Sequence, residues 1–239
     1  MMSSALDGAS LLVRFDDVGA VSPRLAQVWA VLERHGAPLN LEVVPGWMNE
    51  GAAVSLSERA KRSHVSVVVH QHGADHVNHG TDNRRFEFDD SRGVDTQFAD
   101  IQRGRAWLEA SLPDLFEPVF SPPWNRYGVS TLKALVRAEF SLFSSMVRPN
   151  APTHPSLTCI PMTVDPVRWR PVPKHQPWID TLGELVWALE RDGYAGLELH
   201  HEVMTDEDIE ELDRLLETLR VRGVRYPPMI AIADRARCK

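Results

Sequence analysis

The sequence predicts an α/β protein, a distorted (β/α) barrel of seven or eight strand–helix units. Short apolar runs, typical of buried strands, alternate with longer amphipathic runs, typical of helices, along the chain. No internal repeat, low-complexity tract or long linker interrupts this alternation, and seven or eight such units fill 239 residues. We therefore expect residues 1–239 to form a single catalytic domain.

Turn and capping residues divide the first half of the chain. Ser22-Pro23 has the features of an N-cap followed by proline in the first turn of a helix, which Gly36 ends. Ser55-Leu-Ser-Glu58 has capping-box spacing for a short helix, and Val67-Val68-Val69 is typical of a strand buried on both faces. The expected strands are 11–15, 39–44 and 65–70, and a long amphipathic helix is expected over 94–112.

The second half continues the alternation around a segment rich in proline. That segment, 148–177, permits one strand at 157–162. Thr205-Asp-Glu-Asp208 opens a last helix that runs to about Arg222. The other expected elements are an apolar run at 118–121, helices at 130–139 and 178–192, and strands at 140–145, 197–201 and 230–233.

Composition excludes several classes of protein. A net charge of −7 argues against a general nucleic-acid binder. No apolar stretch approaches the roughly 20 residues that span a membrane, and Met1–Gly8 shows no signal peptide. Cys159 and Cys238 lie far apart, so no disulfide is expected. We therefore expect a cytoplasmic protein that binds neither nucleic acid nor membrane; the sequence leaves its oligomeric state open.

Reactive side chains follow the strand ends that can be placed with most assurance. The carboxyl ends of parallel strands gather on one side of such a fold, and active sites lie there. The residues concerned are Asp16 and Asp17 after the first strand, His70, His72 and His76 after the third, and His200 and His201 near the end of the chain.

His72 and His76 are candidate metal ligands. Two histidines four residues apart share one face if the chain makes a helical turn there. With one carboxylate, they form a two-histidine, one-carboxylate metal site with open positions. The alternative is a pair of surface-loop histidines. We favour a metal because four of the ten histidines fall within ten residues.

Asp16 and Asp17 are two adjacent carboxylates at the end of a buried strand, where they repel each other. A helix cap would explain one of them. A metal ion that binds one would relieve the repulsion and leave the other as a base. Strand alternation would point the two apart, so a bend is needed, and Gly19 permits one.

Two further features could contribute to a site. One histidine of the pair His200-His201 should face the barrel axis, where it could act as a general acid; the alternative is a helix-entry histidine with no chemical role. The prolines before Trp124 should hold its ring in place, and an aromatic face suits a sugar, although Trp124 could also be core.

Together these motifs resemble the polysaccharide deacetylases, carbohydrate esterases related to the chitooligosaccharide and peptidoglycan deacetylases. The resemblance covers residues 11 to 203 and is greatest to a less studied bacterial branch. The matching motifs are a strand ending in two aspartates (Phe15-Asp16-Asp17), two histidines separated by three residues (His72 and His76), a proline-containing loop (Ser121-Pro-Pro-Trp-Asn125) and a strand ending in histidine (Leu199-His200-His201).

The resemblance implies a metal-dependent hydrolase that removes an N-acetyl or other N-acyl group from a small or oligomeric sugar. Asp17, His72 and His76 would hold one divalent ion, with zinc as the first expectation. Asp16 would be the general base and His200 the general acid. Trp124 and Asn125 would contact the substrate, and His70 would support the site.

Three departures from the family pattern leave questions open. The arginine that many members carry just before the proline loop, where it steadies the base, is Ser121 here. We expect Arg92, or else Arg126, to replace it. An apolar residue usually lines the acetyl pocket two positions before the acid; Leu199 fits that place only if His201 is the acid. Thirdly, without a visible signal peptide, a soluble intracellular N-acyl compound is as plausible as a cell-wall substrate.

Three rival functions remain. A catalytically inactive glycan-binding protein could use the same fold, with Ser121 as the sign of lost activity. A metal amidohydrolase could act on a non-sugar N-acyl compound. A phosphatase with Asp16 or Asp17 as nucleophile is less favoured, because that mechanism usually places one residue between its two aspartates.

Overall fold

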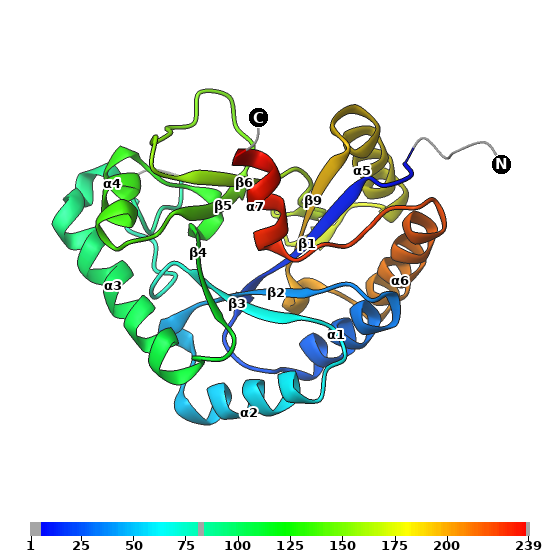
Figure 1. Cartoon of the computed structure of the whole chain (residues 1–239), viewed down its shortest axis with the longest axis horizontal. Helices are drawn as coiled ribbons and strands as arrows, with labels where there is room; N and C mark the ends of the chain where they lie inside the picture. The colour runs from blue at the N-terminus through cyan, green and yellow to red at the C-terminus, as the bar shows by residue number, and fades with distance from the viewer. Residues whose placement is uncertain (1–5, 81–83, 238–239) are drawn as a thin grey trace.

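The computed structural model contains a nearly closed barrel of parallel strands surrounded by helices (Figure 1). It describes residues 6–80 and 84–237, with only the backbone of 234–237. The strand order is β6-β5-β4-β3-β2-β1-β9. The strands are β1 (Ser10–Val18), β2 (Leu39–Val43), β3 (Val67–His72), β4 (Phe116–Ser121), β5 (Leu142–Met146), β6 (Thr158–Met162) and β9 (Tyr194–Leu199). The expected barrel is confirmed.

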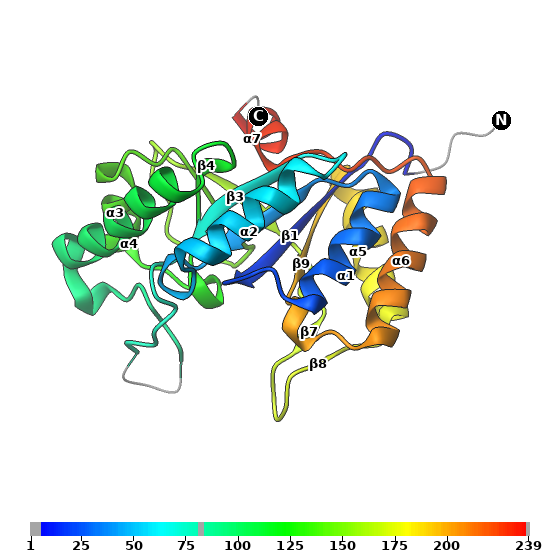
Figure 2. The same ribbon diagram turned by 90° about the horizontal axis from the view of Figure 1, so that it is seen from below.

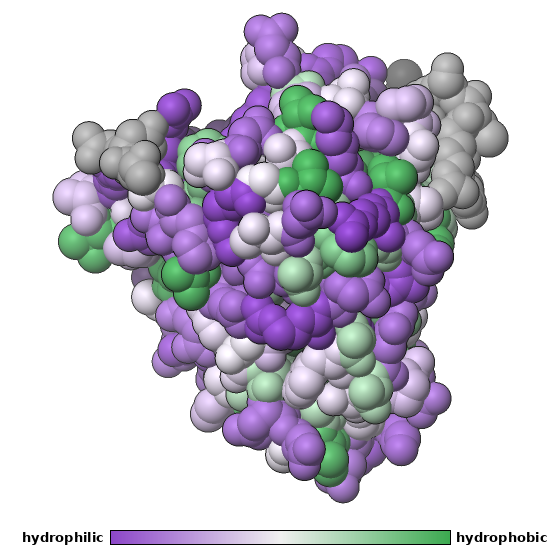
Figure 3. Space-filling view, turned by 90° about the vertical axis from the view of Figure 1, so that its left-hand side faces the viewer, coloured by the Kyte–Doolittle hydropathy of each residue, from purple (hydrophilic) through white to green (hydrophobic). Residues whose placement is uncertain are grey.

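The helices lie outside the strands. They are α1 (Pro23–His35), α2 (Glu50–Lys61), α3 (Gly93–Ser111), α4 (Val129–Arg137), α5 (Trp178–Asp192), α6 (Asp206–Val221) and α7 (Met229–Arg237). The face formed by α3 and α4 is mainly hydrophilic, with scattered apolar residues (Figure 3). No helix in the described part of the chain is long and apolar enough to cross a membrane.

The first and last strands of the sheet meet just beyond β6. The backbone N–H groups of Thr163 and Val164 donate to the carbonyl of Gly196 at 3.0 and 2.9 Å, and Glu198 N–H donates to the Val164 carbonyl at 2.9 Å. Glycine is required at 196, since a Cβ there would lie 2.8 Å from the Pro161 carbonyl oxygen. These hydrogen bonds join β9 to the segment that follows β6, and the barrel is therefore nearly closed.

Alternation along β1 separates a polar interior from an apolar exterior. Leu11, Val13 and Phe15 belong to the large core between strands and helices. Arg14 is fully buried and reaches Ser144 on β5, which is not a neighbour of β1 in the sheet. Its side chain therefore crosses the barrel interior. Polar groups inside a barrel must be paired, and this pairing builds the site described below.

Helix α7 closes the amino end of the barrel. Met229 and Ile232 pack with Leu12 of β1 and Val119 of β4 in a separate apolar cluster. In Figure 2, α7 lies on the opposite side of the molecule from the loop after β3 and the short β7–β8 hairpin. The expected strand at 230–233 is wrong. A four-residue apolar run does not distinguish a strand from one turn of a buried helix.

Three other local predictions need revision or lie outside the described residues. Helix α2 begins after Asn49, whose side chain accepts from Ala52 N–H, so the expected capping box at Ser55 is wrong. The proline-rich segment contains the expected strand, as β6, and also an antiparallel hairpin of β7 (Val167–Arg168) and β8 (Lys174–His175). Cys159 is a free thiol. Cys238 lies outside the described residues.

Candidate active site

A bulge at the end of β1 turns both aspartates toward the same region. The pairing of β1 with β2 shifts between Phe15 and Val18, and Asp17 has φ 62°, in the left-handed region that aspartate tolerates better than most residues. The bend that the two carboxylates require is thus made at Asp17 itself. The expectation that Gly19 provides it is wrong.

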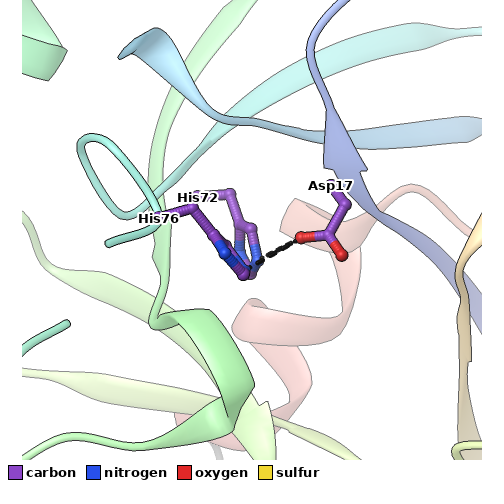
Figure 4. A group of neighbouring side chains, drawn as sticks. All are labelled: Asp17, His72 and His76. Carbon is purple, nitrogen blue, oxygen red and sulfur yellow. Dashed lines mark ion pairs between the residues drawn. The ribbon is translucent and has the colours of Figure 1, made fainter. Parts of the chain in front are cut away.

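Asp17, His72 and His76 converge as a compact group (Figure 4). Asp17 Oδ1 lies 3.3 Å from His72 Nε2 and 3.0 Å from His76 Nε2. Among the described residues no donor is aligned to give this oxygen a hydrogen bond. Burial would raise the pKa of Asp17, but the two histidines outweigh it and hold that pKa well below its usual range. One possible ligand atom from each of the three residues therefore lies within 4.8 Å of the other two.

A chain of buried polar groups fixes the proton of His72. Ser121 Oγ donates to Glu42 Oε2 at 2.5 Å, so it can only accept from His72 Nδ1, 2.8 Å away. His72 therefore carries its proton on Nδ1 and presents Nε2 to Asp17. Glu42 Oε1 also lies 2.9 Å from His70 Nδ1. Burial opposes the charge on His70, but Glu42 and Glu117 raise its pKa to about 9.

His76 is held by its loop and not by a helix. Residues 74 and 75 form a bend and residues 73 and 76 have no regular structure, so the expected helical turn is wrong. Instead, Glu87 Oε1 accepts from the backbone N–H groups of Asp75 at 2.7 Å and His76 at 3.0 Å. The His76 ring contacts two indoles, with its centroid 5.0 Å from that of Trp47 and 4.4 Å from that of Trp124. Packing therefore sets its orientation.

Asp16 is paired with an arginine from its own strand. Arg14 Nε and Nη2 donate to the two carboxylate oxygens of Asp16, both at 2.7 Å. Burial would raise the pKa of Asp16, but Arg14, then His72 and His200, lower it. A forked guanidinium on a carboxylate is among the strongest pairings in proteins. Asp16 is thereby kept ionised in a buried position.

The expectation that Arg92 or Arg126 makes this contact is wrong. Arg92 instead donates to Asp100 at 2.7 Å and to the carbonyl of Glu87 at 3.0 Å. Arg126 lies over the ring of Phe86. Both follow loops that leave the carboxyl ends of the strands, whereas Arg14 lies on the same face of β1 as Asp16, two residues earlier.

Glu198 and Asn125 complete the surroundings of Arg14. Arg14 Nη2 lies 3.0 Å from Glu198 Oε2, and Asn125 Nδ2 donates to Glu198 at 2.8 Å. Asn125 Oδ1 accepts from Arg14 and from Met146 N–H. Burial, together with Asp16 and Asp165, raises the pKa of Glu198 well above its usual value although Arg14 lowers it.

Two expected substrate contacts are therefore wrong. The polar atoms of Asn125 are occupied inside the protein, and its side chain is buried. Leu199 is fully buried in the core between strands and helices. Since alternate residues of a strand face opposite ways, Glu198 faces the interior and Leu199 cannot line a pocket there.

The two strand-end histidines have different surroundings. His200 lies with Asp16 and Glu198 in one cluster, and its ring meets Trp169 edge-on at 4.6 Å. Its Nδ1 is 3.9 Å from Asp165 Oδ1. His201 begins a short turn and lies 3.1 Å from Glu202. Burial lowers the pKa of His201, although Glu202 and Asp17 oppose this.

The residues around Asp17 suit a divalent metal ion. His72 Nε2, unprotonated once Nδ1 donates to Ser121, would face the Asp17 carboxylate with a lone pair; a cation between them removes that repulsion. Asp16, Glu198 and His200 also have close ligand atoms, but the Arg14 guanidinium already pairs with both carboxylates. That second cluster does not suit a cation.

Several residues of the site were not predicted from the sequence. The sequence pattern could have indicated Arg14, because a lone arginine within an apolar strand must pair with a buried partner, and Asp16 lies two residues later on the same face. Glu42 and Glu198 are likewise charged residues within apolar strands. Glu87, Asp165 and Trp169 lie in irregular segments, where spacing gives no orientation.

Comparisons with known proteins find solved structures with a similar fold. No family model matches the chain, and no curated protein matches its sequence. Among solved structures, a candidate polysaccharide deacetylase from Mycobacterium smegmatis is 17% identical, with TM-score 0.70, covering 97% of this chain and 92% of that one. A family 4 acetyl xylan esterase from Clostridium thermocellum, in complex with a cobalt ion, is 16% identical, with TM-score 0.63, covering 95% and 91%.

A third structure is a mutant of a pseudoenzyme of the same carbohydrate esterase family. It is 15% identical, with TM-score 0.61, and the match covers 94% of this chain and 66% of the pseudoenzyme. The chain has the fold of the polysaccharide deacetylases and family 4 carbohydrate esterases. At these identities the likeness is one of fold.

Proposed function

We propose that this protein is a metal-dependent hydrolase that removes an N-acetyl or other N-acyl group from a carbohydrate-like substrate. The observation that carries the proposal is the convergence of Asp17, His72 and His76 beside a second, ionised carboxylate, Asp16. Two imidazoles and one carboxylate leave positions open on a bound metal ion, as catalytic sites require. The deacetylase fold supports the same reaction.

The metal, with zinc as the first expectation, would supply Lewis-acid polarisation of the acyl carbonyl and lower the pKa of water. Asp16, ionised through Arg14, removes the proton from the attacking water. Ser121 keeps His72 in the tautomer that presents Nε2. Trp124, which contacts His76, offers its ring to the sugar.

We assign the general acid to His200. Its ring lies with Asp16 and Glu198, and Asp165 faces its Nδ1. A proton on the opposite nitrogen can pass to the leaving amine. His201 lies against Glu202, and burial lowers its pKa, which leaves it neutral and less suited to the role.

Metal analysis and acetate release test the proposal together. The purified protein should hold about one divalent ion per chain, and His72→Ala or His76→Ala should lose most of it, since such losses cost roughly 10–100-fold or more in affinity. His79→Ala, in the same loop, is the matched control. Asp16→Asn should abolish acetate release from N-acetylated sugars yet keep the metal. Metal retained equally in His72→Ala and His79→Ala contradicts the site.

Because a pseudoenzyme has a similar fold, glycan binding without hydrolysis is the alternative function. A panel of N-acetylated sugars and non-sugar N-acyl amides, measured for both binding and acetate release, separates the possibilities. Binding of sugars without release at any pH indicates a glycan-binding protein. Release from non-sugar amides alone indicates a different amidohydrolase. The single domain and the cytoplasmic location stay predictions.

A further inference from the structure

The β7–β8 hairpin and the first turns of α5 and α6 form the walls of a cleft of about 640 Å³. Its volume lies in the range of cavities that bind small molecules. The hairpin contributes Arg168, Lys174 and His175 to the lining, and the two helices contribute Asp180 and Glu207. None of these residues belongs to the candidate active site, so the cleft is a separate feature.

His175 brings an unpaired acceptor to the wall of this cleft. Its side chain is 2% exposed, and its Nδ1 lies 3.1 Å from Asp208 Oδ2. Burial would raise the pKa of Asp208, but hydrogen bonds from Thr205 and Trp178 lower it, so the carboxylate is ionised and can only accept. A neutral His175 ring therefore carries its proton on Nδ1 and leaves Nε2 as an acceptor. No described residue is placed to donate to that buried nitrogen.

Gln176, the next residue, brings a second acceptor. Its side chain is buried, and its Nε2 donates to Thr181 Oγ1 at 3.1 Å and to Glu184 Oε1 at 3.4 Å. Because a carboxylate only accepts, the amide must turn its nitrogen toward Glu184, and its Oε1 has no donor among the described residues. Buried polar atoms are rarely left unpaired. Two of them on one cleft favour a ligand that donates hydrogen bonds.

Negative charge near these acceptors indicates which kind of donor fits. Asp180 lies in the first turn of α5 and Glu207 in the first turn of α6, and both side chains are exposed. Within the described part of the chain neither forms an ion pair. A charged donor gains more from carboxylates than a neutral one does, so the helix side of the cleft suits an ammonium group.

The hairpin side carries the opposite charge. Arg168 and Lys174 stand directly opposite each other in the two-residue ladder of β7 and β8, and both are exposed. Neither forms an ion pair with a residue that the structure describes. Like charges at such a position destabilise a ladder, and an anion bound by both would remove the repulsion. A carboxylate matches the guanidinium geometry.

Solvation alone explains only part of this arrangement. Water can donate to His175 and Gln176, and exposed charges are usually hydrated. Water does not explain two cations held opposite each other, or their separation from the carboxylates on the helices. Ile179, 72% exposed on the rim, adds an apolar surface that water does not favour.

We propose that this cleft binds a free α-amino acid with an apolar side chain. The ammonium group donates to His175 Nε2 and Gln176 Oε1 beside the helix carboxylates. The carboxylate binds Arg168 and Lys174, and the apolar side chain packs on Ile179. The inference goes beyond the proposed function, because this second site needs no metal and no N-acyl group.

Nuclear magnetic resonance titration of the nitrogen-labelled, metal-loaded protein tests the inference with three matched probes. Leucine carries both charges, isoamylamine lacks the carboxylate and isocaproic acid lacks the ammonium group. The indole N–H of Trp178, which donates to Asp208 at 2.9 Å, is the local reporter, and Trp178→Phe identifies its signal. Leucine should shift this signal saturably and bind roughly 10-fold or more tightly than either other probe, as charge-assisted bonds allow.

Two variants assign the two ends of the ligand. Lys174→Gln should weaken leucine and leave isoamylamine unchanged, whereas Glu207→Gln should weaken leucine and isoamylamine and leave isocaproic acid unchanged. Lys133→Gln and Glu58→Gln are the matched controls, because both residues are exposed on other helices and neither lines the cleft. Both controls should leave all three affinities as they are in the native protein.

Three results overturn the inference. The first is that leucine gives no saturable shift of the Trp178 signal, and the second is that all three probes bind equally. The third is that Lys174→Gln and Glu207→Gln change leucine binding no more than the two controls do. Because metal content and acetate release do not enter this measurement, its failure leaves the proposed function untouched.

Discussion

At the scale of single residues, Arg14 has the greatest consequence for chemistry. It is fully buried and pairs with two buried carboxylates, Asp16 and Glu198. Breaking such a pair leaves an uncompensated charge in the interior. The basicity of Asp16 therefore depends on a residue that also supports the fold.

Substitution of Arg14 should change the pH dependence of catalysis. Arg14 lowers the pKa of Asp16, so its loss raises that pKa, and the base becomes protonated at higher pH. The acidic limb of the kcat/KM profile should therefore move upward in Arg14→Gln, which should also lose about 3–5 kcal/mol of stability. Arg14→Lys keeps the charge, should fold, and should move the limb less.

The matched control is Arg92→Gln, because Arg92 contacts Asp100 and not Asp16. Its acidic limb should coincide with that of the native protein. An unchanged limb in both Arg14 variants would mean that Asp16 is not the base.

His72 makes metal affinity dependent on pH. Burial opposes a charge on His72, but Asp16 and Asp17 outweigh it and raise its pKa above the usual 6.5. Since a proton on Nε2 excludes the metal, affinity should fall as pH decreases, starting above 6.5. Competition with a chelator across about pH 5.5 to 8.5 measures this. A constant affinity down to about pH 6 would show that His72 is not a ligand.

At the scale of elements, the loop after β3 positions His76 through one glycine and one carboxylate. Gly73 has φ 63°, and a Cβ there would lie 2.0 Å from Glu87 Oε2 and 2.6 Å from Pro123 Cγ. Glu87 holds the next residues through their backbone N–H groups. The loop can therefore take this path only with glycine at 73.

Gly73→Ala should destabilise the protein by more than about 1 kcal/mol and weaken metal binding, because both the left-handed backbone and the contact with Glu87 forbid a Cβ. Gly183→Ala is the opposite case. Gly183 lies inside α5 with nothing within 4 Å of the added Cβ, so alanine should stabilise by about 0.5–1 kcal/mol. Denaturant unfolding and metal titration of both variants provide the comparison. Equal effects would contradict the assigned role of Gly73.

At the scale of the whole molecule, the two ends of the barrel differ. The amino end is apolar and covered by α7, and the carboxyl end carries the reactive side chains. Met229 and Ile232 fill the amino end, while Asp16, Asp17 and His72 lie at the carboxyl end. The network of paired polar groups around Arg14 lies inside the barrel, between these two ends. We expect the closed end to contribute stability and little to catalysis.

Two isoleucines on α7 test this division. Ile232 is buried and Ile230 is exposed. Ile232→Ala should cost about 2–4 kcal/mol of unfolding free energy, while Ile230→Ala should stay within about 0.5 kcal/mol. Metal affinity of the folded proteins should remain unchanged in both. A loss of metal in Ile232→Ala at temperatures where it is folded would mean that the two ends are coupled.

The sequence by itself determined the architecture and the grouping of the reactive residues. Local periodicity reports which segments are strands, and parallel strand order gathers their carboxyl ends. Asp17 and the two histidines therefore meet although more than 50 residues separate them. The approximate positions of most of the strands and most of the helices along the chain followed from the same patterns.

Only the tertiary structure decided the partners inside the barrel. Arg14 meets Asn125 and Ser144, 111 and 130 residues away, because closure of the barrel sets the strands across from one another. Whether Glu198 or Leu199 faces inward depends on strand register, which a sequence pattern leaves open by one residue. The helical form of 229–237 depends on the apolar cluster that Met229 and Ile232 join. Register and closure are collective properties of all the strands, and no single segment encodes them.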